Sequence, residues 1–319
     1  MKKGLIILAA VLVITGLAVY TAAFAAADFD FSKFGALKTE TNTYTVSEDF
    51  DDIEITAKDS DIIFEPTVGG EFSATCVENE KIKHTVSVQG GTLKITAVDG
   101  RKWYDHLDFF PKKLSLTVKL PRNAYKALKI DSGTGNVSVP ETFAFESADI
   151  TASTGDVDFG ARVTGGLNIY ANTGDINIRG VFAESVNLKV STGDISAQSV
   201  VCDNDITVTV ETGRTELTGV NCDNLTSVGS TGRIKLKDCF AARKITVERS
   251  TGDVIFDNSD GGEIYVKTST GDVTGTLKTA KVFDAKASTG KVSVPDSATG
   301  GKCEIRTSTG DIRITIAEG

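Results

Sequence analysis

Residues that commonly carry catalysis or bind metals are scarce in this sequence. It has 2 histidines, 1 tryptophan and 5 prolines among 319 residues, and aromatic residues make up only 7%. Serine and threonine are abundant, but nucleophilic catalysis needs an adjacent base. Neither His84 nor His106 lies in the repetitive part of the chain, where the hydroxyl residues are most regular. The sequence therefore predicts a protein that is not an enzyme and has no catalytic residues and no cofactor.

Charge and cysteine usage argue against a nucleic-acid-binding protein and against a protein held together by disulfides or zinc. The formal net charge is −9 without a dense basic cluster, whereas binding to nucleic acid needs clustered cations that neutralise phosphate. The 5 cysteines are odd in number and contain no Cys-x-x-Cys pair, so they form neither a disulfide framework nor a zinc motif. They are Cys76, Cys202, Cys222, Cys239 and Cys303. We expect no nucleic-acid partner and no bound metal from these patterns.

An uncharged run opens the chain. Lys2 and Lys3 precede residues 4–27, which carry no charge, and a helix of that length spans a hydrocarbon core of roughly 30 Å. The two lysines predict a single-pass segment with a cytoplasmic N-terminus and an extracytoplasmic C-terminal domain at the cell membrane. A cleaved signal peptide is the alternative, since residues 23–27 are mostly small. A signal core is usually only about 7–15 residues long, so we expect the membrane anchor.

A Thr-Gly dipeptide recurs through most of the remaining chain. Its glycines are 19 or 20 residues apart, and five of the ten units read Ser-Thr-Gly-Asp followed by Val or Ile, as in residues 153–157 and 308–312. Such regularity predicts a stacked repeat architecture. The glycines are Gly135, Gly155, Gly174, Gly193, Gly213, Gly232, Gly252, Gly271, Gly290 and Gly310.

Apolar and polar residues alternate on both sides of each glycine. The residue seven positions earlier is apolar in every unit, and only Ser227 and Thr215 break the pattern five positions before and two positions after the glycine. Period-two alternation predicts half-buried strands, so each unit is strand, bend, strand and return loop. Stacking at about 4.8 Å buries the apolar faces, and parallel crossovers are right-handed. We predict an all-β, right-handed β-solenoid of about ten 19–20-residue coils, with a positive φ at each bend glycine.

The pattern divides the chain into four parts. Residues 1–27 are the transmembrane anchor or signal segment, and residues 28–48 are a juxtamembrane spacer. Residues 49–126 contain strand-like runs but lack the Thr-Gly word, so we expect a β cap over one end of the solenoid. Residues 127–319 are the solenoid itself.

Two of the cysteines occupy equivalent repeat positions. Cys202 and Cys222 each follow a bend glycine by nine residues, so they should stack in adjacent coils at a separation that suits a disulfide. Side chains stacked in register point the same way, however. We therefore expect free thiols.

These features resemble a known bacterial family, the domain of unknown function 4097. The resemblance is carried by the Ser-Thr-Gly-Asp words at their 19–20-residue spacing, and by an exported segment followed by a β region with Arg101-Lys102-Trp103-Tyr104-Asp105. It covers roughly residues 40–319. The resemblance implies an adhesin-like protein of the envelope, and some family members look connected to envelope-stress systems. It implies no catalytic or binding residue.

The residue after the bend glycine is aspartate in six of the ten units. Asp156, Asp175 and Asp194 stand in three successive units, and stacked carboxylates are ligands that Ca²⁺ favours. The alternative is a turn-favouring aspartate that bonds its own bend, and the spacing lacks the nonapeptide pattern of calcium-binding β-rolls. These three residues are calcium candidates, although we expect the turn role.

The segment from residue 103 to residue 110 is the least repeat-like part of the chain beyond its N-terminal run. It contains Trp103, Tyr104, Phe109 and Phe110, and exposed aromatic side chains carry much of the energy of many interfaces. We name these four as candidate partner-binding residues. A loop that plugs the end of the solenoid core is the alternative.

Together these patterns predict a membrane-tethered, non-catalytic binding protein whose partner is a protein or a cell-wall glycan. The last strand, residues 312–316, should leave an open end for end-to-end self-association. A regulatory component of an envelope-stress response is one alternative. A carbohydrate-active enzyme on a β-helix is another, although its acids would gather at one break in the repeat rather than follow it.

Overall fold

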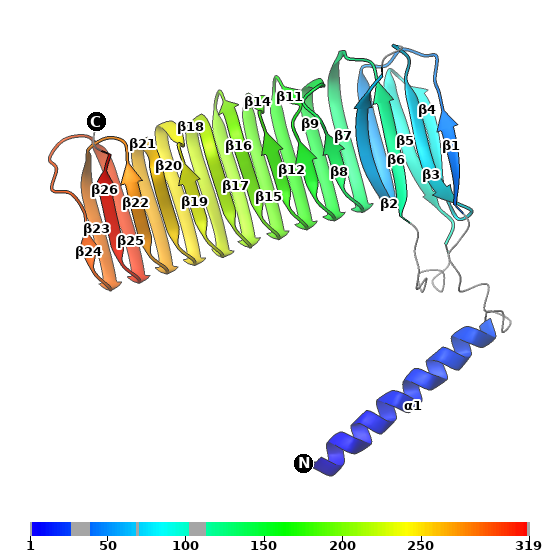
Figure 1. The fold of residues 1–319 in the computed structure, drawn as a ribbon, viewed down its shortest axis with the longest axis horizontal. Coiled ribbons are helices and arrows are strands. Elements are labelled where there is room, and N and C mark those ends of the chain that lie inside the picture. Colours follow the sequence, from blue (N-terminus) through cyan, green and yellow to red (C-terminus); the bar gives the residue numbers. More distant parts are fainter. Residues whose placement is uncertain (1, 27–38, 68–69, 102–112, 318–319) are drawn as a thin grey trace.

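The structure is a computed structural model with one helix and many strands (Figure 1). The helix, α1, covers Lys2–Ala26 and stands apart from the strands. Its large apolar side chains, such as Val11 and Ile14, are more than half exposed. The residues that the structure describes are 2–26, 39–67, 70–101 and 113–317.

The predicted N-terminal helix is present. Among the described residues, no helix is long and apolar enough to cross a membrane. The membrane anchor over residues 4–27 stays a prediction.

The strands form one all-β, right-handed-type solenoid of about ten turns, as predicted. The first six lie at the blue and cyan end of the rod in Figure 1. They are β1 (Thr39–Tyr44), β2 (Asp52–Pro66), β3 (Ser73–Asn79), β4 (Ile82–Gln89), β5 (Thr92–Asp99) and β6 (Leu114–Leu120). The coils that follow consist of β7 (Ala124–Thr134), β8 (Val137–Val139), β9 (Ala144–Thr154), β10 (Val157–Phe159), β11 (Arg162–Val163), β12 (Gly166–Thr173), β13 (Ile176–Arg179), β14 (Phe182–Ala183), β15 (Ser185–Thr192), β16 (Ile195–Cys202), β17 (Asp205–Thr212), β18 (Thr215–Thr231), β19 (Ile234–Lys237), β20 (Phe240–Thr251), β21 (Val254–Thr270), β22 (Val273–Leu277), β23 (Lys281–Thr289), β24 (Val292–Ser293), β25 (Gly301–Thr309) and β26 (Ile312–Ile316).

Each coil has a long strand before the bend and a shorter strand after it. β12 stacks in parallel on β15, and β13 stacks in parallel on β16, with equivalent residues of the two repeats directly paired. Short strands such as β11 and β14 occupy part of the segment expected as a return loop. The coil therefore has a third, narrow side that the sequence pattern did not predict.

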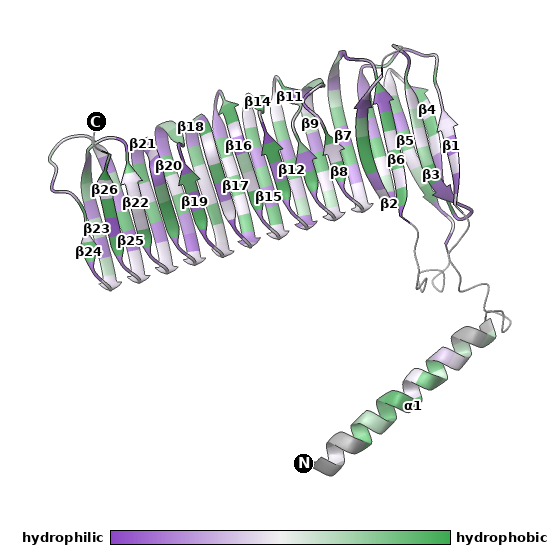
Figure 2. Ribbon diagram, viewed as in Figure 1, coloured by the Kyte–Doolittle hydropathy of each residue, from purple (hydrophilic) through white to green (hydrophobic). Residues whose placement is uncertain are grey.

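Period-two alternation produces the core. In β15 the side chains of Val186, Leu188 and Val190 are buried, whereas Asn187 and Lys189 between them are exposed. The same alternation of apolar and polar residues runs along the other strands (Figure 2). Burying one such aliphatic side chain is worth roughly 1.5–3 kcal/mol, and stacking makes the buried face continuous from coil to coil.

Two separate constraints, the backbone conformation and the close contact with the preceding coil, require glycine at the bends. All ten have a positive φ, as predicted, and at Gly213 it is 144°. A Cβ added at Gly213 would also overlap the carbonyl oxygen of Gly193 in the preceding coil. Side chains larger than hydrogen are therefore excluded by both the backbone conformation and the stacking distance.

The solenoid stack extends into the region predicted as a cap. β2 pairs in parallel with β7 and β8, with Ile53 opposite Leu128 and Ile62 opposite Val137. Its bend carries no Thr-Gly word, yet Asp61 takes the place of the post-glycine residue. On its other side β2 pairs with β5 and β6. The antiparallel strands β1, β3, β4 and β5 then close this end of the rod.

The last two coils stack in the reverse of their order in the chain. β25 lies between β21 and β23, and β26 lies between β22 and β24. The backbone amide of Gly271 accordingly donates to the carbonyl of Thr309, and that of Gly310 donates to Thr289. The expectation that the strand at residues 312–316 forms the open end is wrong. β23 and β24 form the outer edge.

Apolar content explains this reversal. The inserted coil buries Cys303, Ile305 and Ile312 almost completely, whereas Phe283, Ala285 and Ala287 of the outer coil are only partly buried. Placing the more apolar coil between two others removes more apolar surface from water. The step from β23 back to β25 keeps the strand direction while reversing the advance along the axis. This crossover therefore has the opposite hand to the others.

A buried arginine explains Thr215, one of the two exceptions to the apolar pattern. Arg249 lies inside the core, where its Nη1 donates to the carbonyl of Val210 at 2.6 Å and its Nη2 donates to the Thr215 hydroxyl at 2.8 Å. The missing side chain of Gly229 leaves the space that the guanidinium occupies. Burial lowers the pKa of Arg249 to about 10. Thr215 thus accepts a hydrogen bond from a buried cation, whereas the buried Ser227 hydroxyl has no hydrogen-bond partner.

Candidate functional site

The predicted aromatic contact residues lie outside the described part of the chain. Trp103, Tyr104, Phe109 and Phe110 fall within residues 102–112. Their role in binding a partner stays a prediction.

The aspartate column has a structural partner in the backbone. Asp156 Oδ1 accepts the amide hydrogen of Asp175 at 2.8 Å, and Asp175 Oδ1 accepts that of Asp194 at 2.8 Å. Asp194 continues the ladder to the amide of Arg214 at 2.7 Å and also pairs with its guanidinium at 2.6 Å. Burial alone would raise the pKa of Asp194, but the hydrogen bonds from Arg214 lower it below its ordinary value. Each carboxylate therefore accepts a hydrogen bond from the next bend, in place of the bond to its own bend that the turn role implied, and calcium binding stays a prediction.

The long strands present a flat polar face. Equivalent outward residues stand in register on β12, β15, β17, β18, β20 and β21, and all are exposed or half-buried. Two lysines each lie over the ring of a tyrosine in an adjacent coil, with Lys189 Nζ 5.6 Å from the centre of Tyr170 and Lys244 Nζ 5.7 Å from that of Tyr265. The outward column consists of Asn168, Asn187, Thr207, Thr226, Thr246 and Tyr265.

A groove runs across the strands that follow the bends. We call it the polar groove. Its volume is about 490 Å³, and it crosses the four successive strands β8, β10, β13 and β16. Inside it Asn177 Nδ2 donates to Asp158 Oδ1 at 3.1 Å. The residues that line it are Ser138, Val139, Pro140, Asp158, Phe159, Gly160, Asn177, Ile178, Arg179, Ser196 and Gln198.

Side-chain chemistry in the polar groove suits an extended ligand with many hydroxyl groups. Asp158 supplies acceptors, Arg179 supplies donors, and the amides of Asn177 and Gln198 supply both. In-register pairing puts one hydrogen-bonding side chain of each coil in a row, namely Ser138, Asp158, Asn177 and Ser196, and a second row adds Arg179 and Gln198 in two of the coils. The groove can therefore offer one set of hydrogen bonds per coil along the rod axis.

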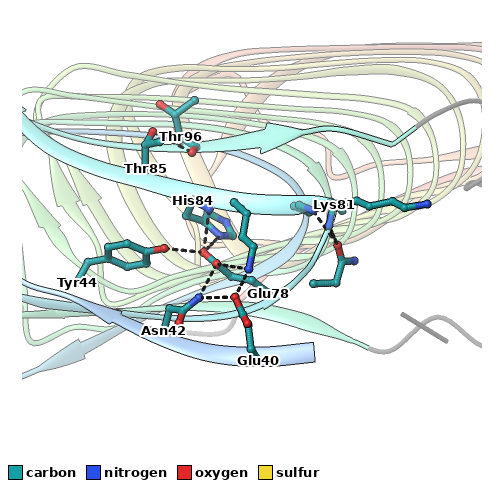
Figure 3. A network of polar contacts seen from close by, with 11 residues as sticks. Glu40, Asn42, Tyr44, Glu78, Lys81, His84, Thr85 and Thr96 are labelled. Atoms are coloured by element: carbon teal, nitrogen blue, oxygen red, sulfur yellow. Dashed lines mark hydrogen bonds and ion pairs between the residues drawn. The ribbon is translucent and has the colours of Figure 1, made fainter. Parts of the chain in front are cut away.

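A second polar cluster lies inside the cap. Glu78 on β3 is fully buried, and it accepts hydrogen bonds from the His84 amide at 2.8 Å and from Asn42 Nδ2 at 3.0 Å (Figure 3). The Tyr44 hydroxyl lies 3.3 Å from the same carboxylate, and His84 Nδ1 lies 3.0 Å from it. Burial alone would raise the pKa of Glu78, but the hydrogen bonds from Asn42 and His84 lower it.

The β3–β4 turn builds this cluster. Asn79 Oδ1 accepts the amide hydrogens of Lys81 at 2.9 Å and Ile82 at 2.7 Å, which closes a tight turn directly after Glu78. The turn brings β4 back so that His84 faces β3. Within the described residues, the cap cluster also contains the one group of metal-ligating side chains whose donor atoms lie within 4.8 Å of one another: Cys76, Glu78 and His84.

Sequence reasoning missed this cluster because the spacing of its residues matches no metal or catalytic motif. The available signal was the alternation along β3. Phe72, Ala74 and Cys76 occupy inward positions, and Glu78 is the next inward residue. A carboxylate at an inward position of an alternating strand predicts a buried polar partner.

All five cysteines are buried and free, as expected for Cys202 and Cys222. Burial raises the pKa of Cys222 to about 12 and that of Cys239 to about 11. Thiols in this state react slowly, because the thiolate is the nucleophile.

The fold and its surface define a repetitive β-solenoid protein with a flat polar face and with the polar groove, which crosses the strands along the rod axis. A family model confirms the resemblance seen in the sequence, since the model of the Toastrack DUF4097 family matches residues 50–209 and 202–319. The chain belongs to the Toastrack DUF4097 family.

Solved structures align with most of this chain at low sequence identity. A candidate adhesin from Parabacteroides distasonis is 12% identical, with a TM-score of 0.50, and the alignment covers 85% of this chain and 99% of that one. A candidate lipid-binding protein from the same species is 17% identical, with a TM-score of 0.49 and coverage of 87% and 97%. A candidate adhesin from Parabacteroides merdae is 11% identical, with a TM-score of 0.48 and coverage of 88% and 98%.

At these identities the likeness concerns the fold alone. The search among curated proteins found no match.

Proposed function

We propose that this chain is a non-catalytic binding protein of the bacterial envelope that holds an extended cell-wall glycan along the polar groove. The observation that carries the proposal is the groove itself, which crosses four coils and repeats hydrogen-bonding side chains from each coil to the next. A glycan chain is a repeating ligand, so a repeating surface matches it along its length.

The adhesin description of one protein with the same fold supports a role at the cell surface. Export is part of the proposal and rests on the N-terminal segment, with Lys2 and Lys3 followed by the uncharged helix α1. The chain is held at the membrane by this segment unless it is cleaved. The non-catalytic role rests on the acidic residues, which follow the repeat and bond the neighbouring coil.

Sedimentation with isolated peptidoglycan sacculi tests the proposal. We expect the purified full-length chain to sediment with sacculi, since the groove residues hydrogen-bond the glycan. The triple variant Asp158→Ala, Arg179→Ala, Gln198→Ala should bind at least about tenfold more weakly, as loss of several hydrogen bonds implies. A matched triple variant on the flat polar face of the long strands, Thr209→Ala, Glu248→Ala, Lys267→Ala, should sediment like the unchanged chain.

Other outcomes contradict the proposal in different ways. Steady release of glycan fragments, abolished by a single acidic substitution, would identify a carbohydrate-active enzyme. Absence of sedimentation, together with co-purification of a membrane sensor protein, would identify a regulatory role instead. Equal loss in both triple variants would show that the polar groove is not the binding surface.

A further inference from the structure

We propose that Cys76, Glu78 and His84 form a zinc-binding site inside the cap. Cys76 and Glu78 are two residues apart on β3, so their side chains point to the same face of the strand. His84 reaches the same point from β4 across the interior. The side chains of Cys76 and Glu78 are fully buried and His84 is 3% exposed. One thiol, one carboxylate and one imidazole are the ligand types that zinc takes in proteins.

The spacing of the donor atoms is close to that of a zinc site. All three lie within 4.8 Å of one another, and His84 Nδ1 is 3.0 Å from Glu78 Oε1. Zinc bonds of about 2.0–2.3 Å in tetrahedral geometry place neighbouring ligands roughly 3.3–3.6 Å apart. Side-chain movements of about 1 Å therefore suffice to bring the three donors onto one ion.

Two of the three side chains have bonding capacity that the folded protein does not use. His84 Nε2 is buried without a hydrogen-bond partner, and a buried polar atom in that state is destabilising. Among the described residues, Cys76 Sγ has no hydrogen bond, which also holds for Cys222 and Cys303, whereas Cys202 Sγ and Cys239 Sγ each donate to a carbonyl at 3.3 Å. The cap thus holds a buried thiol and a buried imidazole nitrogen, Nε2, that have no hydrogen bonds, while His84 Nδ1 is the nitrogen beside Glu78.

The surroundings complete the site in two respects. Asn42 Nδ2 holds the second oxygen of Glu78 at 3.0 Å, and such outer contacts orient metal ligands. A zinc ion with one thiolate and one carboxylate is neutral overall, so the buried site would carry no net charge. Lys83, at the rim, pairs with Glu40 and lies 3.9 Å from Glu78 Oε2, and the side chains of Lys83 and Glu40 are about half exposed.

Cys76 and Glu78 lie on β3, His84 lies on β4, and Asn42 on β1 bonds Glu78. Bound zinc would therefore link the strands that close the end of the rod. It would thereby stabilise the cap, and with three protein ligands the fourth position stays open to water, unlike the closed four-ligand structural sites. This inference is independent of glycan binding.

Metal titration of the full-length chain tests the site. After dialysis against a chelator, we expect the protein to bind one equivalent of Zn²⁺ and to show a thiolate-to-metal charge-transfer band with Co²⁺. Cys76→Ala and His84→Ala should each weaken Zn²⁺ binding at least about tenfold and remove or alter the Co²⁺ spectrum, because each removes a ligand. Cys303→Ala, which changes a buried cysteine at the other end of the rod, should bind like the unchanged chain.

Absence of the Co²⁺ charge-transfer band in the unchanged protein would overturn the site by itself, even if the variants fail to fold. Binding that persists equally in Cys76→Ala and His84→Ala would also overturn it. Far-ultraviolet circular dichroism of each variant shows whether it retains its β structure.

Discussion

Gly213→Ala is expected to lower the free energy of unfolding by at least about 3 kcal/mol, which is large for a single methyl group. The added Cβ would overlap the carbonyl oxygen of Gly193, and the backbone φ of 144° is strained for any residue with a side chain. Neither problem can be relieved locally, because the contact is between two backbones in a stacked ladder. Urea denaturation followed by circular dichroism measures the change in the unfolding midpoint and free energy.

Gly180→Ala is the matched control for this prediction. Gly180 also has a positive φ, of 65°, but a Cβ there meets no atom within 4 Å. The equivalent positions of later coils hold Ser199, Asp238 and Asn258 with φ values of 50–54°. We therefore expect Gly180→Ala to lower the free energy of unfolding by only about 1 kcal/mol. Equal effects of the two substitutions would show that stacking distance does not impose glycine at the bends.

Deleting residues 301–319 is expected to unfold two coils instead of one. These residues form β25 and β26, which lie between the coil of β21 and β22 and the coil of β23 and β24. Without them β23 and β24 lose their partner strands, and a single coil cannot bury its apolar face alone. Hydrogen exchange should show that residues 281–293 lose the protection of their backbone amides.

Deletion of residues 278–319 is the control, because it removes both coils and leaves β21 and β22 at the edge. Amide protection of residues 254–277 should then be the same in the two truncated chains. A solenoid stacked in chain order behaves differently, since residues 281–293 would stay protected when only residues 301–319 are removed.

The repeat pattern was sufficient to predict the solenoid because every unit has the same alternation of apolar and polar residues around a bend glycine. Apolar residues at alternate positions define the buried face, and the bend glycines mark where each coil turns. The free state of Cys202 and Cys222 also follows from position in the repeat. These features depend on one unit and its neighbour, so the sequence contains all the information they need.

The coil order at the far end could not be predicted, because all units have nearly the same pairing pattern. The choice depends on a comparison between whole coils, in which the interior coil has Ile305 and Ile312 where the outer coil has the smaller Ala285 and Val292. The coil formed by β2 was missed for another reason. It stacks like the others but has Ser60 where they have glycine.

The candidate sites were also only partly predictable. The polar groove depends on how side chains from four coils combine across the sheet, and a pattern within one repeat does not show this. The cap cluster depends on the turn at Asn79, which brings His84 over Cys76 and Glu78. The aspartates after the bends were visible in the sequence, but their use as acceptors for the next coil follows from the stacking.

Side-chain amide signals of asparagine and glutamine in nuclear magnetic resonance test the proposed glycan binding most directly. Soluble peptidoglycan fragments are added to the full-length chain labelled with ¹⁵N at these side chains, and signals are assigned with Asn177→Asp, Gln198→Glu and Asn187→Asp. The proposal predicts that the signals of Asn177 and Gln198, in the polar groove, shift. The signal of Asn187, which lies on the flat polar face of the long strands, should not shift. Unchanged Asn177 and Gln198 signals at saturating glycan, or shifts confined to Asn187, would contradict it.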